Sequence, residues 1–414
     1  MKFYYKFCSF LIFIFDKVIP KKKNYWGFST HHIKSDQFVE NARALFEEVK
    51  KDASFKKIIF SREGVYDFEI DGAVNYEVLS LKSLKGVIAL MKCQVLFVTH
   101  SISMDYSFRF GNSDFSVNKL NLSNRHVINL WHGIPLKKLY ALWNTKVKSR
   151  LDRVGYRNVE RKGYKGLISS SRIDSYAMAT MFHPLEYSRV WTTGLPRNDF
   201  LLMSKKELPN YFKEQLNRLE EIKKDKKLIL YAPTYRQTKV DSSSKYYQFS
   251  SEEIDNLKNV LKKHNAIFGF RMHYFRNDEN LFNVEDFIDN ELIFDLGHSE
   301  FSEIAVTIRG ANMVISDYSS VFVESMYVNK PLISFAYDLE HYEAHQDGLL
   351  YDYNLVFPGK VVKSFVELIR SIDEEMENPD IVNSEGYQFS KKFFFENIDK
   401  LNSRRVVDKI KDSL

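Results

Sequence analysis

The sequence predicts an α/β protein with two domains, each built on a parallel β-sheet. Short apolar runs rich in β-branched and aromatic residues alternate with helix-like segments, which is typical of buried parallel strands joined by helices. The alternation restarts once, after the charged, helix-prone stretch 204–227. A chain of 414 residues is also long enough for two hydrophobic cores of ordinary size, and it is longer than a single domain usually is.

The first half of the chain contains seven expected strands, separated by helix-like segments such as 37–51 and 171–181. Most of these strands do not alternate apolar and polar residues, which indicates that both of their faces are buried. The expected strands are 24–30, 57–61, 75–79, 94–100, 126–131, 166–170 and 190–193.

The second half repeats the pattern with five more expected strands, at 228–232, 266–271, 292–295, 313–316 and 331–336. The domain boundary is expected near 202–208, which gives Rossmann-like domains over 24–203 and 204–414. The last helix could pack back on the first domain. In two such halves that face a central cleft, a ligand is expected at the carboxyl ends of the strands.

The charge balance favours a partner that carries phosphate. Sixty Lys and Arg against 54 Asp and Glu give a net charge of +6, which suits phosphates or an anionic membrane surface. No dense basic block with interleaved aromatics occurs, so we expect no nucleic acid as partner. Cys8 and Cys93 lie far apart, which favours a reducing cytoplasm without disulfides. No metal or cofactor motif and no convincing acidic pair occurs, so neither is expected.

The N-terminal segment 1–23 is strongly apolar and basic. Residues 7–15 read FCSFLIFIF between lysines, but about nine residues are far fewer than the roughly 20 that a spanning helix needs. No small-residue cleavage site follows, which argues against a signal peptide. We expect a helix that lies on the membrane surface, with its lysines toward lipid phosphates. The alternative is a helix packed on the protein's own core.

The segment 129–138, NLWHGIPLKK, places a histidine where a buried strand ends. Gly133 allows a sharp turn and Pro135 stops the strand. His132 therefore stands at the carboxyl end of a strand, where α/β active sites form. It could take a proton from an attacking hydroxyl at neutral pH. The alternative is a histidine that only hydrogen-bonds a loop carbonyl.

Two further segments follow expected strands. In GLPRND (194–199), Arg197 and Asp199 could pair across the turn and bind substrate, although a structural turn between domains is the preferred interpretation. In YAPTYR (231–236), Arg236 could clamp a phosphate with two hydrogen bonds. The alternative for Arg236 is an ordinary surface arginine.

The segment FRMHY (270–274) carries two cationic side chains at a strand end. Because side chains two residues apart share a face of a strand, Arg271 and His273 are a candidate pyrophosphate site. His273 could also protonate the leaving phosphate. The alternative is a structural pair.

The segment ISDYSSVFVE (315–324) passes from a strand into a helix. Ser319 or Ser320 is a natural N-cap, and the free N–H groups with the helix dipole favour an anion there. Two hydroxyls beside Asp317 suggest more than capping. Glu324, about one turn into the helix, could accept hydrogen bonds from ribose hydroxyls.

Together these segments resemble the CDP-glycerol glycerophosphotransferase family, the teichoic-acid primases and polymerases. The family pattern W-H-G-T-P-L-K, G-Y-P-R-N-D, Y-A-P-T-W-R, R-x-H-P and D-Y-S-S stands here, in the same order, as WHGIPLK, GLPRND, YAPTYR, RMHY and DYSSVFVE. AYDLEHYE (336–343) and the Pro358-Gly359 pair also resemble segments of the family. The resemblance as a whole covers residue 24 to the C-terminus. Departures at Ile134, Tyr235, Tyr274 and Glu324 leave the exact donor open.

The resemblance implies a GT-B fold, with the acceptor on the N-terminal domain and the donor on the C-terminal one. It implies transfer of a polyol phosphate from a CDP-activated donor to a hydroxyl of a lipid-linked, teichoic-acid or capsule-type polymer, with release of CMP and without a metal. Glycerol phosphate is the expected group, and ribitol phosphate stays open. His132 would be the base. The side chains implied to hold the pyrophosphate are Arg236, Arg271, His273, Ser319 and Ser320.

Two alternatives from other classes remain at this stage. The fold would also suit a glycosyltransferase that uses a nucleotide sugar, because fold does not determine chemistry. A non-catalytic polymer-binding protein of a capsule complex is the other. The expected location is peripheral, on the cytoplasmic face of the cell membrane.

Overall fold

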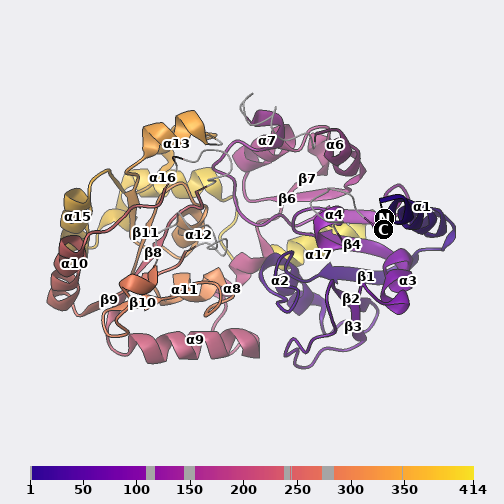
Figure 1. Ribbon diagram of the computed structural model, residues 1–414, viewed down its shortest axis with the longest axis horizontal. Helices are drawn as coiled ribbons and strands as arrows, with labels where there is room; N and C mark the ends of the chain where they lie inside the picture. Colours follow the sequence, from indigo (N-terminus) through magenta and orange to yellow (C-terminus); the bar gives the residue numbers. More distant parts are fainter. Residues whose placement is uncertain are drawn as a thin grey trace. The chain divides into compact units, whose positions relative to one another are not determined.

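The computed structural model describes residues 2–108, 117–143, 154–236, 243, 245–272, 284–346 and 348–414 (Figure 1). The chain divides into two compact units. Unit 1 comprises Met1–His132, Arg153–Asn210 and Asp399–Leu414, and unit 2 comprises Gly133–Asp152 and Tyr211–Ile398. The chain therefore passes between the units at several points, and the sequence does not signal that residues 133–152 belong with the later part of the chain.

Unit 1 is built on a seven-stranded parallel sheet in the order β3-β2-β1-β4-β5-β6-β7. All seven expected strands are present, and those followed by candidate site residues end one or two positions early. Their bounds are β1 Lys22–Ser29, β2 Lys56–Ser61, β3 Tyr76–Ser80, β4 Cys93–Val98, β5 His126–Asn129, β6 Gly166–Ser169 and β7 Val190–Thr192.

Helices on both faces explain why these strands lack polar alternation. Consecutive side chains in β2 and β4, such as Ile58 with Ile59 and Leu96 with Phe97, are all fully buried. The helices of unit 1 are α1 Lys2–Val18, α2 Glu40–Val49, α3 Leu84–Lys92, α4 Ile102–Asp105, α6 Val154–Gly163, α7 Arg172–Met181, α8 Asp199–Leu202 and α17 Asn402–Ser413, with the short 3₁₀ turns η2 Tyr187–Arg189 and η3 Pro196–Asn198.

Unit 2 has a six-stranded parallel sheet in the order β10-β9-β8-β11-β12-β13. Five of the strands were expected, and the edge strand β13 was not, because its three residues carry too little pattern. The bounds are β8 Lys227–Ala232, β9 Ala266–Phe270, β10 Ile293–Asp295, β11 Met313–Ser316, β12 Leu332–Phe335 and β13 Lys360–Val362.

The helices of unit 2 cover this sheet, and α10 and α15 enclose an apolar cluster that includes Phe268, Phe335 and Ile372. Both of these helices begin with a reciprocal capping box, from Ser250 and from Ser364. The helices are α9 Asn210–Lys223, α10 Ser251–Lys263, α11 Ile304–Gly310, α12 Val321–Tyr327, α13 Leu339–His345, α14 Tyr353–Val356, α15 Phe365–Glu377 and α16 Glu385–Phe394, with the turns η1 Tyr140–Leu142, η4 Val284–Asp286 and η5 Ile381–Asn383.

The N-terminal helix α1 is anchored to unit 1 through one buried carboxylate. Asp16 pairs with Arg125, lies 2.9 Å from Lys21 and accepts a hydrogen bond of 2.7 Å from the backbone of Asn121. The outer side of α1 exposes large apolar side chains. Within the described residues, no helix combines the length and the apolar character that crossing a bilayer requires. The exposed side chains are Tyr4, Phe7, Phe10, Ile14, Phe15 and Val18.

Candidate active site

The Trp-His corner that follows β5 is held in a strained backbone conformation. Trp131 has a φ of +48°, in the left-handed region that bulky residues rarely adopt. Its N–H donates to Oδ1 of Asn129 over 2.8 Å. The side-chain nitrogen of Asn41 donates to the carbonyl oxygens of Leu130 and Trp131, at 2.9 and 3.0 Å. Two buried asparagines therefore fix the corner that presents His132.

The side chain of His132 is half-buried, and one of its nitrogens is committed to the protein. Nδ1 lies 3.1 Å from the carbonyl oxygen of Thr99. A carbonyl can only accept, so Nδ1 carries the hydrogen and Nε2 keeps its lone pair. Burial lowers the pKa of His132, and the nearby Arg197 lowers it further, while the Thr99 carbonyl and Glu40 oppose the shift. The bond to the loop carbonyl thus fixes the tautomer, and burial favours the neutral imidazole with a basic Nε2.

Four histidines gather beside this corner. Ring centroids are 4.7 Å apart for His31 and His32, 3.7 Å for His32 and His100, and 4.2 Å for His100 and His132. They follow β1, β4 and β5, which are neighbours in the sheet, so their carboxyl ends meet. This cluster was not predicted from the sequence, although a histidine at the end of, or directly after, each of three expected strands was a usable signal.

The GLPRND turn lies against the same corner. The backbone N–H of Arg197 donates to Oδ1 of Asn41 over 3.0 Å, and Nη1 of Arg197 lies 3.3 Å from Oε1 of Glu40. Asn41 therefore links Arg197 to the backbone on either side of Trp131. Asn41 and Glu40, at the start of α2, carried no sequence motif and were missed.

Asp199 has a structural role in unit 1. Its two carboxylate oxygens accept hydrogen bonds from the backbone of Asn402 and Ser403, at 2.9 and 2.8 Å, and so cap the start of α17. Burial raises the pKa of Asp199 to about 6. Gly194, with a φ of +78°, lies where an added Cβ would collide with Asn402. Asp199 thus caps a helix of its own unit, and its substrate contact stays a prediction.

Arg236 is fully buried in unit 2 and bonded to acidic side chains. Nε lies 3.0 Å from Asp338, Nη2 lies 2.9 Å from Asp317, and Nη1 donates to the carbonyl of Thr234 over 2.9 Å. Asp317 also accepts from the Thr234 N–H over 2.7 Å. The alternative of an ordinary surface arginine is therefore wrong. Arg236 and Asp317 form a structural ion pair, and the phosphate clamp of Arg236 and the ligand contact of Asp317 stay predictions.

The other predicted residues of unit 2 fall into two groups. Arg271 follows β9, and its Nη1 donates to the carbonyls of Leu296 and Phe301, at 2.8 and 2.9 Å. His273 lies outside the described residues, so whether it shares a face with Arg271 stays a prediction. Glu324 is 1% exposed within α12.

The serine pair stands at the start of α12, which is only seven residues long. Ser320 occupies the N-cap position, but in the described residues its side chain makes no capping bond. Ser319 Oγ accepts from the Val321 N–H over 3.4 Å instead. Both serines are half-buried, so their hydroxyls remain candidates for a ligand.

Gly133 begins a segment that belongs to unit 2. The chain leaves unit 1 after His132, and Lys137 then forms an antiparallel bridge with Leu349. Lys138 N–H donates to the Gly348 carbonyl over 3.0 Å. The chain thus crosses from unit 1 to unit 2 within the Trp-His-Gly corner.

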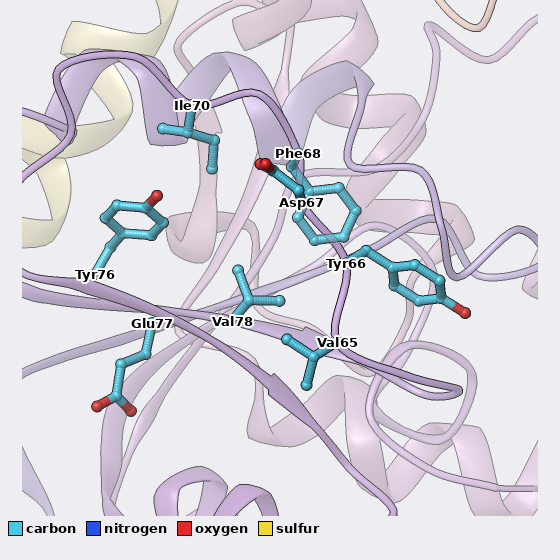
Figure 2. A pocket seen from close by; sticks show the side chains of 8 residues that line it. All are labelled: Val65, Tyr66, Asp67, Phe68, Ile70, Tyr76, Glu77 and Val78. Carbon is cyan, nitrogen blue, oxygen red and sulfur yellow. The ribbon is translucent and has the colours of Figure 1, made fainter.

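An open pocket of about 490 Å³ lies in unit 1 at the edge strand β3 (Figure 2). Its lining includes Tyr66, Phe68 and Tyr76, and Arg43 holds the loop by donating to the Phe68 carbonyl over 2.8 Å. The pocket contains no residue that the sequence predicted for the site.

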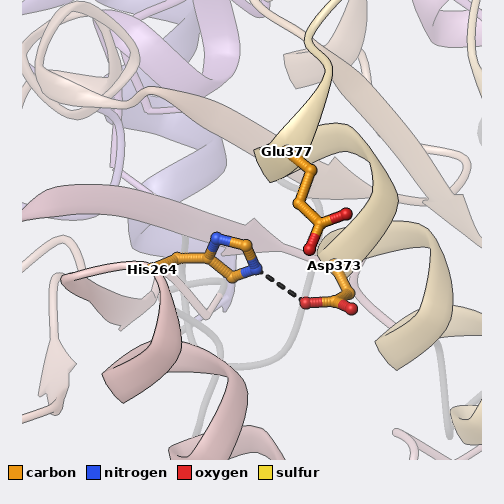
Figure 3. Close-up of side chains that lie close together, drawn as sticks. All are labelled: His264, Asp373 and Glu377. Carbon is orange, nitrogen blue, oxygen red and sulfur yellow. Dashed lines mark hydrogen bonds and ion pairs between the residues drawn. The ribbon is translucent and has the colours of Figure 1, made fainter.

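One group of side chains in the described part of the chain has ligand atoms close enough to hold a metal ion, namely His264, Asp373 and Glu377 (Figure 3). His264 Nε2 lies 2.7 Å from Asp373. The amino group of Lys263 already lies 2.8 Å from Asp373 and 2.7 Å from Glu377. The group is therefore an ion-pair network between α10 and α15, and it contains none of the predicted site residues.

Comparison with known proteins identifies relatives. Residues 12–412 match the family of CDP-glycerol:poly(glycerophosphate) glycerophosphotransferases. The chain is 30% identical over 358 residues to a teichoic acid poly(ribitol-phosphate) polymerase of Bacillus spizizenii W23, covering 85% of this chain and 52% of that protein. It is 25% identical over 366 residues to a teichoic acid glycerol-phosphate transferase of Staphylococcus aureus, covering 85% of each. The chain spans about half the length of the first relatives it matches.

The fold is also known from solved structures. The wall teichoic acid polymerase TagF, in a variant soaked with CDPG, superimposes with a TM-score of 0.71 at 20% identity, covering 95% of this chain and 90% of that one. The α/β fold with two parallel sheets is therefore GT-B-like, as the sequence predicted. With a family match over nearly its whole length, the chain belongs to the CDP-glycerol:poly(glycerophosphate) glycerophosphotransferase family.

Proposed function

We propose that this chain transfers glycerol phosphate from CDP-glycerol to a hydroxyl of a teichoic-acid or capsule-type polymer and releases CMP. The observation that carries the proposal is the state of His132. Its Nδ1 is held by the Thr99 carbonyl, its Nε2 keeps a lone pair, and burial favours the neutral ring. Family membership supplies the donor and acceptor classes.

In the proposed reaction, Nε2 of His132 takes the proton of the acceptor hydroxyl. The acceptor oxygen forms a bond to the phosphorus that carries glycerol, and the bond from that phosphorus to the bridging oxygen breaks. The bridging oxygen keeps the electron pair and leaves as part of CMP. A positioned base of this kind contributes about 10²–10⁴-fold to a rate.

The donor contacts are proposed for unit 2. Arg271 and the hydroxyls of Ser319 and Ser320 are proposed to bind the pyrophosphate, and Glu324 to contact the ribose. His273 is proposed to protonate the leaving group. Arg197 would act through its charge on His132, and no metal or cofactor is proposed.

CDP-ribitol is the second candidate donor. Ribitol-phosphate polymerases of Bacillus spizizenii and Staphylococcus aureus are 29–30% identical to this chain, and the glycerol-phosphate relatives are 25–28% identical. Departures from the family pattern, such as Ile134 and Tyr235, also leave the donor open.

A donor screen tests the proposal. The protein is incubated with CDP-glycerol or CDP-ribitol and lipid-linked or oligosaccharide acceptors, and CMP release is measured with mass analysis of the product. We expect release with one of the two donors and its loss in His132→Ala. His126→Ala is the matched control, because His126 stands at the opposite end of β5.

Other outcomes would assign the protein to another class. Turnover of UDP-sugars without turnover of CDP-polyols would make it a glycosyltransferase. Polymer binding without nucleotide affinity would make it a non-catalytic binding protein. No CMP release from either donor with several acceptors would end the proposal.

We also propose that the protein associates peripherally with the cytoplasmic face of an anionic membrane. The exposed apolar side chains of α1 and its lysines support this. Through α1, the chain would meet a lipid-linked acceptor at the surface where that acceptor is held.

A further inference from the structure

His100 lies flat against the proposed base. The ring centroids of His100 and His132 are 4.2 Å apart and their planes differ by 10°. On the same column, His32 lies 3.7 Å from His100. His132 also contacts the ring of Trp131, at 4.0 Å. The plane of the His132 imidazole is therefore set by neighbouring rings and not only by its own backbone.

One short turn supplies both contacts to His132. Thr99 offers its carbonyl oxygen to Nδ1 of His132, and the next residue, His100, offers its ring face. Asp105, at the end of α4, holds this turn by accepting from the N–H groups of Thr99 and His100, at 2.7 and 2.9 Å. The Thr99 hydroxyl lies 3.1 Å from Nδ1 of His100 and orients its ring. The imidazole of His132 is thus held by a hydrogen bond at its edge, to Thr99, and by a stacked ring on its face, from His100.

The surroundings keep both rings neutral. Burial, and then the neighbouring histidines, lower the pKa of His100 well below its ordinary value. Asp105 cannot stabilise an imidazolium strongly, because burial raises the pKa of its carboxyl to about 7 and its Oδ1 is 3.9 Å from Nδ1 of His100. The charged or titratable groups that act on the two rings are His31, His32, Glu40, Asp105, Arg157 and Arg197.

We infer that His100 is a positioning residue for the transfer reaction: its ring face, fixed by the Thr99–Asp105 turn, holds His132 with Nδ1 on the Thr99 carbonyl and Nε2 aimed at the acceptor. This inference rests on the proposed function of His132. A flat aromatic face is what the geometry requires, so another flat ring should serve. Misplacement of a catalytic group by about 1 Å can cost roughly 10²-fold in rate.

Two variants distinguish the effect of the flat ring face of His100 from the effect of the other properties of its side chain. His100→Ala removes the face, and we expect kcat to fall by about tenfold or more while KM for CDP-glycerol changes by less than about twofold. His100→Phe keeps a flat ring, and we expect kcat within about threefold of the wild type. His126→Phe is the control for a histidine-to-phenylalanine change elsewhere in unit 1.

A second readout needs no substrate. In protein with ¹⁵N-labelled histidine, the ring nitrogens of His132 should report hydrogen on Nδ1 in the wild type and in His100→Phe. In His100→Ala they should report a mixture of the two tautomers. This measurement also shows whether each variant is folded.

The outcomes are distinct. Unchanged kcat and unchanged tautomer in His100→Ala would overturn the inference. So would a folded His100→Phe protein that is as defective as His100→Ala, because the flat face would then not be the relevant property. Absence of CMP release by the wild type would instead count against the proposed function, and the nitrogen signals would still decide whether His100 sets the tautomer of His132.

Discussion

The side-chain amide of Asn41 donates a hydrogen bond of 3.0 Å to the carbonyl oxygen of Trp131, 90 positions away in the chain. Trp131 is one of nine residues other than glycine that have a positive φ in the described part of the chain, and such strain persists only where the surroundings enforce it. The oxygen of the same amide accepts from the N–H of Arg197. A single buried side chain thus braces the corner that presents His132.

Asn41→Leu should destabilise unit 1 and lower activity. Leucine is similar in size but cannot bond the carbonyls of Leu130 and Trp131 or the N–H of Arg197. An unsatisfied buried polar group costs about 1–3 kcal/mol, so we expect a loss of roughly 3 kcal/mol or more. Urea unfolding and CMP release measure the two effects. The exposed Asn24→Ala is the control, and wild-type stability in Asn41→Leu would contradict the bracing role.

The pH profile of kcat/KM should report the state of His132. Burial lowers its pKa below the ordinary 6.5, so the base should stay neutral as pH falls from 8 to that value. We expect the acid limb of the profile to lie below pH 6.5, because only protonation of Nε2 removes the base. A limb centred above that value would mean that His132 is not held neutral as described.

The buried carboxyl of Asp105 should make stability depend on pH. Its pKa is raised from 3.8 to about 7 by burial, so between these values the folded state holds a proton that the unfolded state has lost. Stability should therefore fall as pH rises through this window, by at most about 1.4 kcal/mol per pH unit. Asp105→Asn can keep both backbone acceptor bonds without the charge, and should remove the part of the slope that Asp105 contributes beside that of Asp199.

Urea unfolding of the wild type and of Asp105→Asn at pH 5, 6, 7 and 8 measures how the stability of each protein depends on pH. The control is Asp71→Asn, at an exposed position of the same unit, which should leave the slope unchanged. Parallel wild-type and Asp105→Asn curves over the whole range would show that the buried carboxyl does not titrate as argued.

Sequence reasoning was accurate where a local pattern decides the structure. The strand β2, KKIIFS, has consecutive apolar residues at Ile58, Ile59 and Phe60, and it is buried on both faces as predicted. The strand before His132 was also predicted, although it ends at Asn129, two positions earlier than expected. The three-residue strand β13 was missed because so short a segment carries no period.

The sequence was less informative where contacts join distant segments. His32, His100 and His132 meet only because β1, β4 and β5 are neighbours in the sheet, which an order along the chain does not reveal. Arg236 illustrates a second limit of the sequence, which does not show the distant partners of a charged side chain. Its place at a strand end suggested a ligand, but Asp338, 102 positions later, occupies its guanidinium. Long-range partners of charged side chains have no local signature.

Arg236→Met should cost stability before it affects donor binding. The substitution leaves Asp317 and Asp338 without their cation, and removal of one partner from a buried pair costs about 3–5 kcal/mol. Thermal unfolding and CDP binding should be measured together, with the exposed Arg370→Met as control. A variant with wild-type stability that binds CDP more weakly would instead support the phosphate clamp predicted for Arg236.

The exposed aromatic face of α1 should control membrane binding. Deletion of residues 1–17 would also remove Asp16, which anchors the buried Arg125, so its effect on binding could not be separated from damage to unit 1. Replacement of Phe7, Phe10 and Phe15 by serine keeps that anchor. Each buried phenylalanine is worth about 1.5–3 kcal/mol, so we expect sedimentation with anionic phosphatidylglycerol vesicles to weaken by at least about tenfold. Phe389→Ser, at an exposed phenylalanine of α16, should have no effect. Unchanged vesicle binding by the triple variant would mean that α1 does not dock on lipid.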